Sequence, residues 1–118
     1  MIYPIIPVPA PRMTKADVWK KRPCVLRYFA FKDKVKELGI FVPECNSHIT
    51  FVMPMTKGWS KKQKEGMNNK RHQYKPDIDN LLKALLDAIY EDDSHIYDLR
   101  ITKIWGYEGQ IKIEAMNN

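Results

Sequence analysis

The segment from Lys75 to Lys83 holds the residues whose types and spacing could do chemistry. It reads Lys-Pro-Asp-Ile-Asp-Asn-Leu-Leu-Lys, so that Asp77 and Asp79 lie two residues apart and Lys83 follows on the same stretch. In extended chain, side chains two residues apart point to the same side. Hard cations such as Mg²⁺ take ionised carboxylate oxygens as ligands, usually one or two of them together with water and phosphate. The pair is therefore a candidate metal site.

A helix is expected to start at Asp77 and Asp79. Each acid could therefore serve the helix structurally instead of binding a metal. Pro76 disfavours helical geometry at Lys75, so the helix should begin near Asp77. Its N-terminal partial charge favours carboxylates and attracts phosphate, yet a capping role for Asp77 explains the same pattern. Lys83, one turn beyond Asp79, fits either an i,i+4 ion pair or a cation that stabilises charge on a phosphate. The local pattern leaves both interpretations open.

A further acidic pair, Asp92 and Asp93, follows the predicted helix. A helix of about 12 residues is about 18 Å long. Asp93 therefore reaches Asp77 only if the next strand turns back along the helix, or if the sheet brings the two ends together. Otherwise the acidic turn is a solvated helix end.

Charge is distributed unevenly along the chain. Residues 11–75 hold 16 lysines and arginines against 5 acidic residues, whereas residues 76–118 hold 4 against 9. A basic half suits a polyanion and a compact acidic half suits a cation. The basic loop Lys70-Arg71-His72, with Lys75, is a candidate DNA contact. Three aromatic residues could either stack on unpaired bases or pack in the core: Trp19, Trp59 and Tyr74.

Apolar periodicity predicts the fold class. Helices are expected over residues 24–38, 59–67 and 78–90, and strands over residues 2–8, 47–55, 96–105 and 110–115. The first strand should lie at a sheet edge, because its prolines cannot donate to a ladder. The last two strands are separated only by Gly106–Gly109, which predicts an antiparallel hairpin. We expect one domain over residues 1–118, an α/β sandwich with a mixed or antiparallel sheet and a C-terminal hairpin.

Several classes of protein are not expected. No apolar stretch is long enough to span a membrane, and the N-terminus lacks the features of a signal peptide. A cytoplasmic protein without a membrane partner is therefore predicted. Cys24 and Cys45 are isolated in sequence, so a zinc site and a disulfide are both unexpected.

The spacing of these motifs resembles that of the RusA family of Holliday-junction resolvases. The resemblance is carried by Asp77-Ile78-Asp79-Asn80-Leu81-Leu82-Lys83, followed by Asp92-Asp93 and a strand, and it extends from about Lys70 to Met116. The segment Pro7–Thr14, before a helix rich in Tyr, Phe and Lys, also resembles phage members. The resemblance implies a RusA-like fold and a crossover junction endodeoxyribonuclease.

The resemblance implies a role for individual residues of the motif. Asp77, Asp79 and Asp93 would bind Mg²⁺, with Mn²⁺ as a substitute, and Lys83 would support catalysis. Asn80 would be a supporting group. The family also implies a homodimer that nicks two strands of a four-way DNA junction symmetrically.

Two other functions remain alternatives. One is a non-catalytic DNA-binding accessory protein of recombination, in which the acids only cap a helix. The other is a metal-dependent nuclease that prefers flaps or RNA.

Overall fold

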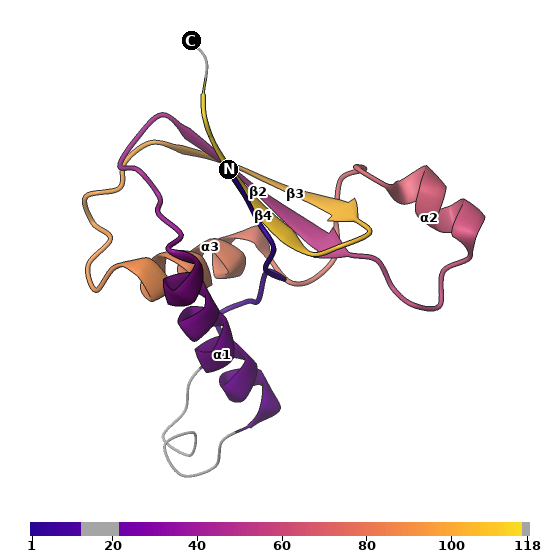
Figure 1. Cartoon of the computed structure of the whole chain (residues 1–118), viewed down its shortest axis with the longest axis horizontal. Helices are drawn as coiled ribbons and strands as arrows, with labels where there is room; N and C mark the ends of the chain where they lie inside the picture. The colour runs from indigo at the N-terminus through magenta and orange to yellow at the C-terminus, as the bar shows by residue number, and fades with distance from the viewer. Residues whose placement is uncertain (13–21, 117–118) are drawn as a thin grey trace.

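The computed structural model describes residues 1–12 and 22–116 of the chain (Figure 1). Its helices and strands follow the predicted order. They are β1 (Ile2–Tyr3), α1 (Pro23–Leu38), β2 (Ser47–Pro54), α2 (Lys61–Met67), α3 (Ile78–Ile89), β3 (Leu99–Gly106) and β4 (Gln110–Ala115). The elements form a single mixed α/β domain, as predicted.

The strands of the described chain form one mixed sheet in the order β1-β4-β2-β3. β2 pairs in parallel with β3, from Ser47 opposite Leu99 to Pro54 opposite Gly106. β4 lies antiparallel on the other side of β2, and β1 pairs antiparallel with β4. The mixed sheet confirms one of the two predicted arrangements, and β1 takes the edge position expected of a strand followed by proline.

The predicted C-terminal hairpin is wrong. β3 and β4 follow one another along the chain, but β2 lies between them in the sheet. The physical reason is that the connection from β2 to β3 runs through α2 and α3, and a parallel pair of strands requires a long crossover of this kind, usually with a helix. The short connection after Gly106 then passes the end of β2 instead of forming a paired turn.

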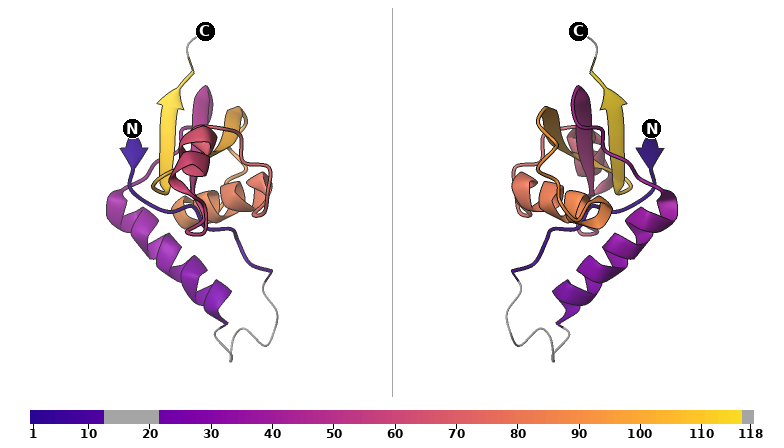
Figure 2. Two further views of the ribbon diagram at one scale, coloured as in Figure 1. Left: turned by 90° about the vertical axis from the view of Figure 1, so that its right-hand side faces the viewer. Right: turned by 90° about the vertical axis from the view of Figure 1, so that its left-hand side faces the viewer.

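Helices α1 and α3 lie on the same side of the sheet and close the core (Figure 2). β2 alternates buried Ile49 and Phe51 with half-buried His48 and Thr50, as expected for a strand with one covered face. Across the two helices, the hydroxyl of Tyr28 donates a hydrogen bond to Asp87 Oδ2 over 3.2 Å. Burial raises the pKa of Tyr28 to about 12, and the neighbouring Asp87 carboxylate adds to the shift.

Local sequence explains where the helices begin and end. Pro23 opens α1, where its missing N–H costs nothing, and Gly39 ends it in the left-handed conformation with φ of 65°. The Ser60 side chain caps α2 by accepting a hydrogen bond from the Gln63 backbone N–H over 3.2 Å. Within the described residues, no helix is both long and apolar enough to cross a membrane.

Candidate active site

The loop before α3 is fastened to the outer edge of β3. The Trp105 backbone N–H donates to Lys70 O over 2.9 Å, and the His72 N–H donates to Lys103 O over 3.0 Å. Arg71 forms an isolated antiparallel bridge with Ile104. This pairing covers the second half of the β3 edge and directs the chain toward Asp77, the residue at which α3 begins.

Asp77 takes the N-cap position of α3, but its side chain makes no capping hydrogen bond. Asp79 lies in the first turn of the helix, and both side chains are exposed. Within the described chain, neither carboxylate belongs to an ion pair or a hydrogen bond, and the i,i+4 ion pair between Asp79 and Lys83 is not formed. The structural roles considered for these acids, capping and ion pairing, are therefore not realised.

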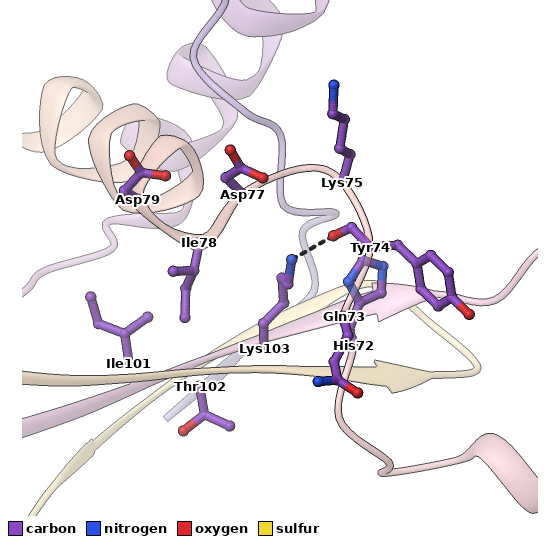
Figure 3. A pocket seen from close by; sticks show the side chains of 10 residues that line it. All are labelled: His72, Gln73, Tyr74, Lys75, Asp77, Ile78, Asp79, Ile101, Thr102 and Lys103. Atoms are coloured by element: carbon purple, nitrogen blue, oxygen red, sulfur yellow. Dashed lines mark hydrogen bonds between the residues drawn. The ribbon is translucent and has the colours of Figure 1, made fainter.

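Asp77 and Asp79 line one open hollow of about 740 Å³ between the start of α3, the preceding loop and β3 (Figure 3). The same hollow is lined by His72, Gln73, Tyr74, Lys75, Ile78, Ile101, Thr102 and Lys103. Two carboxylates free of protein partners, at the start of a helix, form a set of oxygen donors that suits a hard cation. The same helix end suits a phosphate oxygen.

Asp93 is not brought to this hollow. It lines a second hollow with Leu82, Leu86, Ile96, Tyr97, Asp98 and Leu99, toward the other end of α3. No cluster of three or more acidic, histidine or cysteine side chains able to hold a metal occurs among residues 1–12 and 22–116. The expected convergence of Asp77, Asp79 and Asp93 within one chain is therefore not observed. Asp93 lies toward the other end of α3 from Asp77 and Asp79. Along β3, Leu99 lines the hollow of Asp93, whereas Ile101 and Lys103 line the hollow of Asp77 and Asp79.

Asp92 has a local role instead. Its Oδ1 accepts a hydrogen bond from the Ser94 backbone N–H over 2.9 Å, and this bond lowers the pKa of the Asp92 carboxyl. Asp92 therefore shapes the turn after α3. The side chain of Asp92 is therefore used by the turn, whereas the side chain of Asp93 is exposed and unpaired within the described chain.

The other predicted site residues divide into exposed and buried side chains. Lys70, Arg71 and Lys75 are exposed, as a role in DNA contact requires, and Lys83 is exposed on α3. His72 is only 6% exposed, and its ring lies 4.1 Å from that of Trp105, measured between ring centroids. Burial and the nearby charge of Lys103 lower the pKa of His72. A direct phosphate contact by His72 stays a prediction.

The aromatic candidates also differ in their surroundings. Trp59 packs against Trp105 with ring centroids 4.8 Å apart, so it belongs to an aromatic cluster beside the hollow. Tyr74 is 66% exposed at the rim of the hollow and is the more accessible of the two. Trp19 lies outside the described residues. Stacking on a base is therefore better supported for Tyr74 than for Trp59.

Lys103 is the residue of this hollow that sequence reasoning missed. Its ammonium donates hydrogen bonds to the carbonyl oxygens of Tyr74 and Pro76, both over 2.6 Å. A signal was present, because Lys103 interrupts the alternating apolar positions Leu99, Ile101 and Trp105 of the predicted strand. A lysine at such a position is rarely buried without a partner.

Comparison with known proteins bears on this site. The model of the endodeoxyribonuclease RusA family matches residues 29–116, a range that includes Asp77, Asp79, Lys83 and Asp93. The uncharacterized protein YqaN of Bacillus subtilis (strain 168) is 37% identical over 67 residues, which are 52% of this chain and 47% of that protein. The chain thus spans about half the length of this curated relative. No solved structure gives a significant match.

Proposed function

Because this chain belongs to the RusA family of endodeoxyribonucleases, we propose that it is a metal-dependent endonuclease that resolves four-way DNA junctions. The observation that carries the proposal is the pair Asp77 and Asp79. These carboxylates lie in one open hollow at a helix N-terminus, without partners in the described chain. Two carboxylates that line one hollow next to a basic loop suit a site that holds a cation against phosphate.

Asp77 and Asp79 are the residues that would hold Mg²⁺, or Mn²⁺ in its place. The bound ion would supply a water of lowered pKa and neutralise charge on the non-bridging phosphate oxygens. Two carboxylates are enough for such a site, since substrate phosphate and water complete the usual coordination of Mg²⁺. Asp93 remains a proposed third carboxylate, which would act after the 91–98 turn moves or when a second copy of the chain approaches.

The remaining side chains bind and orient the DNA strand. Lys70, Arg71 and Lys75 neutralise backbone phosphates without reading the sequence directly. The loop that carries them is fastened to β3, so that it holds the strand in a fixed register relative to Asp77. Lys83, on the exposed face of α3, is proposed to support catalysis at the scissile phosphate. A homodimer would place two such sites on opposite arms of a junction, giving paired symmetric nicks.

The proposal is tested by incubating the protein with synthetic four-way junctions in Mg²⁺ or Mn²⁺ and mapping the products on denaturing gels. We expect paired nicks in a metal-dependent reaction, and none in EDTA. Flaps, linear duplexes and RNA in the same panel distinguish a junction resolvase from a nuclease of another preference. Binding of junctions without cleavage in either metal would instead support the accessory-protein alternative.

A further inference from the structure

Lys103 occupies a position that the fold would normally give to an apolar residue. Its register partner on β2 is Phe51, which is fully buried, and its neighbours on the same face of β3 are Ile101 and Trp105. Figure 3 shows Ile101 and Lys103 rising from one side of β3 toward α3 and the loop, while Thr102 points to the other side. The core-facing side of the strand therefore contains a lysine that faces the candidate active site.

The contacts of Lys103 are made to backbone oxygens, not to acids. Its ammonium donates to the carbonyls of Tyr74 and Pro76, and Pro76 directly precedes Asp77. An ammonium has three N–H donors, so one remains. No carboxylate within residues 1–12 and 22–116 forms an ion pair with it. The two carbonyls hold the side chain in place and leave its positive charge without an ion-pair partner in the described chain, near the start of α3, where the helix end suits a phosphate oxygen.

The geometry points to Lys103 as a functional cation of this hollow, in addition to Lys75 at its rim, with two linked roles. Through its bonds to Tyr74 and Pro76 it is a positioning residue that fixes the loop from which Asp77 projects. Through its remaining N–H it binds a non-bridging oxygen of a DNA phosphodiester lying over Asp77 and Asp79. This inference rests on the proposed function, since it assumes that the hollow receives a nucleic-acid strand.

The location of Lys103 distinguishes it from Lys83. Lys83 is exposed on α3 and does not line the hollow, whereas Lys103 reaches it from the sheet. A strand lysine held by two carbonyls has lost much of its freedom before DNA arrives. Such a preorganised cation stabilises charge on phosphate more effectively than a mobile one.

Three substitutions separate the two roles. Lys103→Met removes the charge and the donors at similar length, Lys103→Gln keeps an amide donor without charge, and Lys103→Arg keeps both. The matched control is Lys112→Met, which removes another half-buried strand lysine, on β4, whose register partner Thr50 lies on the opposite face of β2. Thermal unfolding of each variant, followed by circular dichroism, shows which of them keep the fold.

The first measurement is the salt dependence of junction binding in EDTA, which requires no cleavage. Loss of one phosphate contact reduces the slope of log K against log salt by about 0.9. We expect this reduction for Lys103→Met and Lys103→Gln, and a wild-type slope for Lys103→Arg and Lys112→Met. A purely structural lysine would leave the slope unchanged in every folded variant, and that result would overturn the phosphate contact.

The second measurement is the single-turnover cleavage rate at saturating protein. Lys103→Met and Lys103→Gln should lower it by about 100-fold, and Lys103→Arg by less than about 10-fold, the scale expected for a preorganised charge at the reacting phosphate. A rate within twofold of wild type for Lys103→Met, which loses both the charge and the donors, would overturn both roles. If the wild-type protein fails to cut while the slopes change as expected, the nuclease proposal fails and the phosphate contact of Lys103 stands.

Discussion

Asp79 and Asp93 line two different hollows along the α3–β3 boundary, toward opposite ends of the helix. Leu82 and Leu86 of α3 lie beside Asp93, whereas Ile78 lies beside Asp79. The two acids therefore make separable contributions in the free chain, and substituting each one alone is informative.

Asp79→Asn should abolish cleavage while junction binding persists. The substitution removes a ligand for the cation but leaves the basic loop intact. We expect the single-turnover rate to fall on the order of 100-fold or more, the scale seen when a charge-stabilising group is lost from an active site. Gel-shift titration in EDTA measures binding, and Glu91→Gln, at an exposed acid outside the hollow, is the matched control. Cleavage near the wild-type rate would remove Asp79 from the site.

Asp93→Asn should affect cleavage but not the metal affinity of the DNA-free protein. Because Asp93 lies in a different hollow, calorimetric titration with Mn²⁺ should give a wild-type dissociation constant for this variant. Asp79→Asn should weaken the same affinity by about 10-fold or more. Equal weakening by both substitutions would mean that the acids converge in solution. A mixture of Asp79→Asn and Asp93→Asn adds a further test. Restored nicking would require Asp93 of one copy of the chain to complete a metal site with Asp77 and Asp79 of another copy.

Sequence reasoning succeeded where local physics decides the structure. Helical periodicity identified α3, the helix expected over residues 59–67 corresponds to α2, and Pro76 placed the start of α3 next to Asp77. It failed where a strand can pair either with its neighbour along the chain or with a distant strand, as for β3 and β4, which both pair with β2. There the strand–helix–strand order of β2, α3 and β3 was the signal for a parallel pair, because α3 has to cross the sheet to bury its apolar face.

The candidate site shows the same division. The Asp77–Asp79 pair could be proposed from spacing alone, because both acids lie on one short segment. The relation of Asp93 to that pair depends on how far β3 turns back along α3, which no local pattern specifies. Lys103 could have been suspected as a charge on an apolar face, but its partners are backbone carbonyls from a loop 27 and 29 residues earlier. Such contacts become visible only in the folded chain.

Lys70→Ala combined with Arg71→Ala should weaken junction binding and flatten its salt dependence. Both side chains are exposed while their backbones are paired with β3, so truncation should remove charge without unfolding the loop. Two lost phosphate contacts would reduce the slope of log K against log salt by about 1.8. The matched control is the double variant Lys34→Ala, Lys36→Ala, which removes the same amount of charge from exposed positions of α1. An identical slope for wild type and the loop variant would exclude this loop from the contact surface.

His72 should make the stability of the protein depend on pH. Its pKa in the folded protein is lowered from 6.5, chiefly by burial and then by the charge of Lys103. The unfolded chain therefore binds a proton at higher pH than the native one, and stability present above pH 6.5 is lost as the pH falls toward the folded pKa. His72→Phe keeps an aromatic ring against Trp105. In this variant the melting temperature should change less between pH 7 and pH 5.5 than it does in the wild type. His95→Gln, at an exposed histidine, should melt as wild type does, and an unchanged pH dependence in His72→Phe would contradict the assignment.

Tyr28→Phe should destabilise the packing of α1 against α3. It removes the hydrogen bond from the Tyr28 hydroxyl to Asp87 and leaves the ring in the core. We expect a loss of about 1 to 2 kcal/mol in the free energy of unfolding by urea. The pKa of Tyr28 is raised to about 12, so wild-type stability from this group is fully present below pH 10 and is lost as the pH rises toward 12. The variant should lack that alkaline loss, whereas Tyr107→Phe, at an exposed tyrosine, should retain it. Equal stability of Tyr28→Phe and wild type at pH 7 would show that the hydroxyl contributes nothing to the contact between the helices.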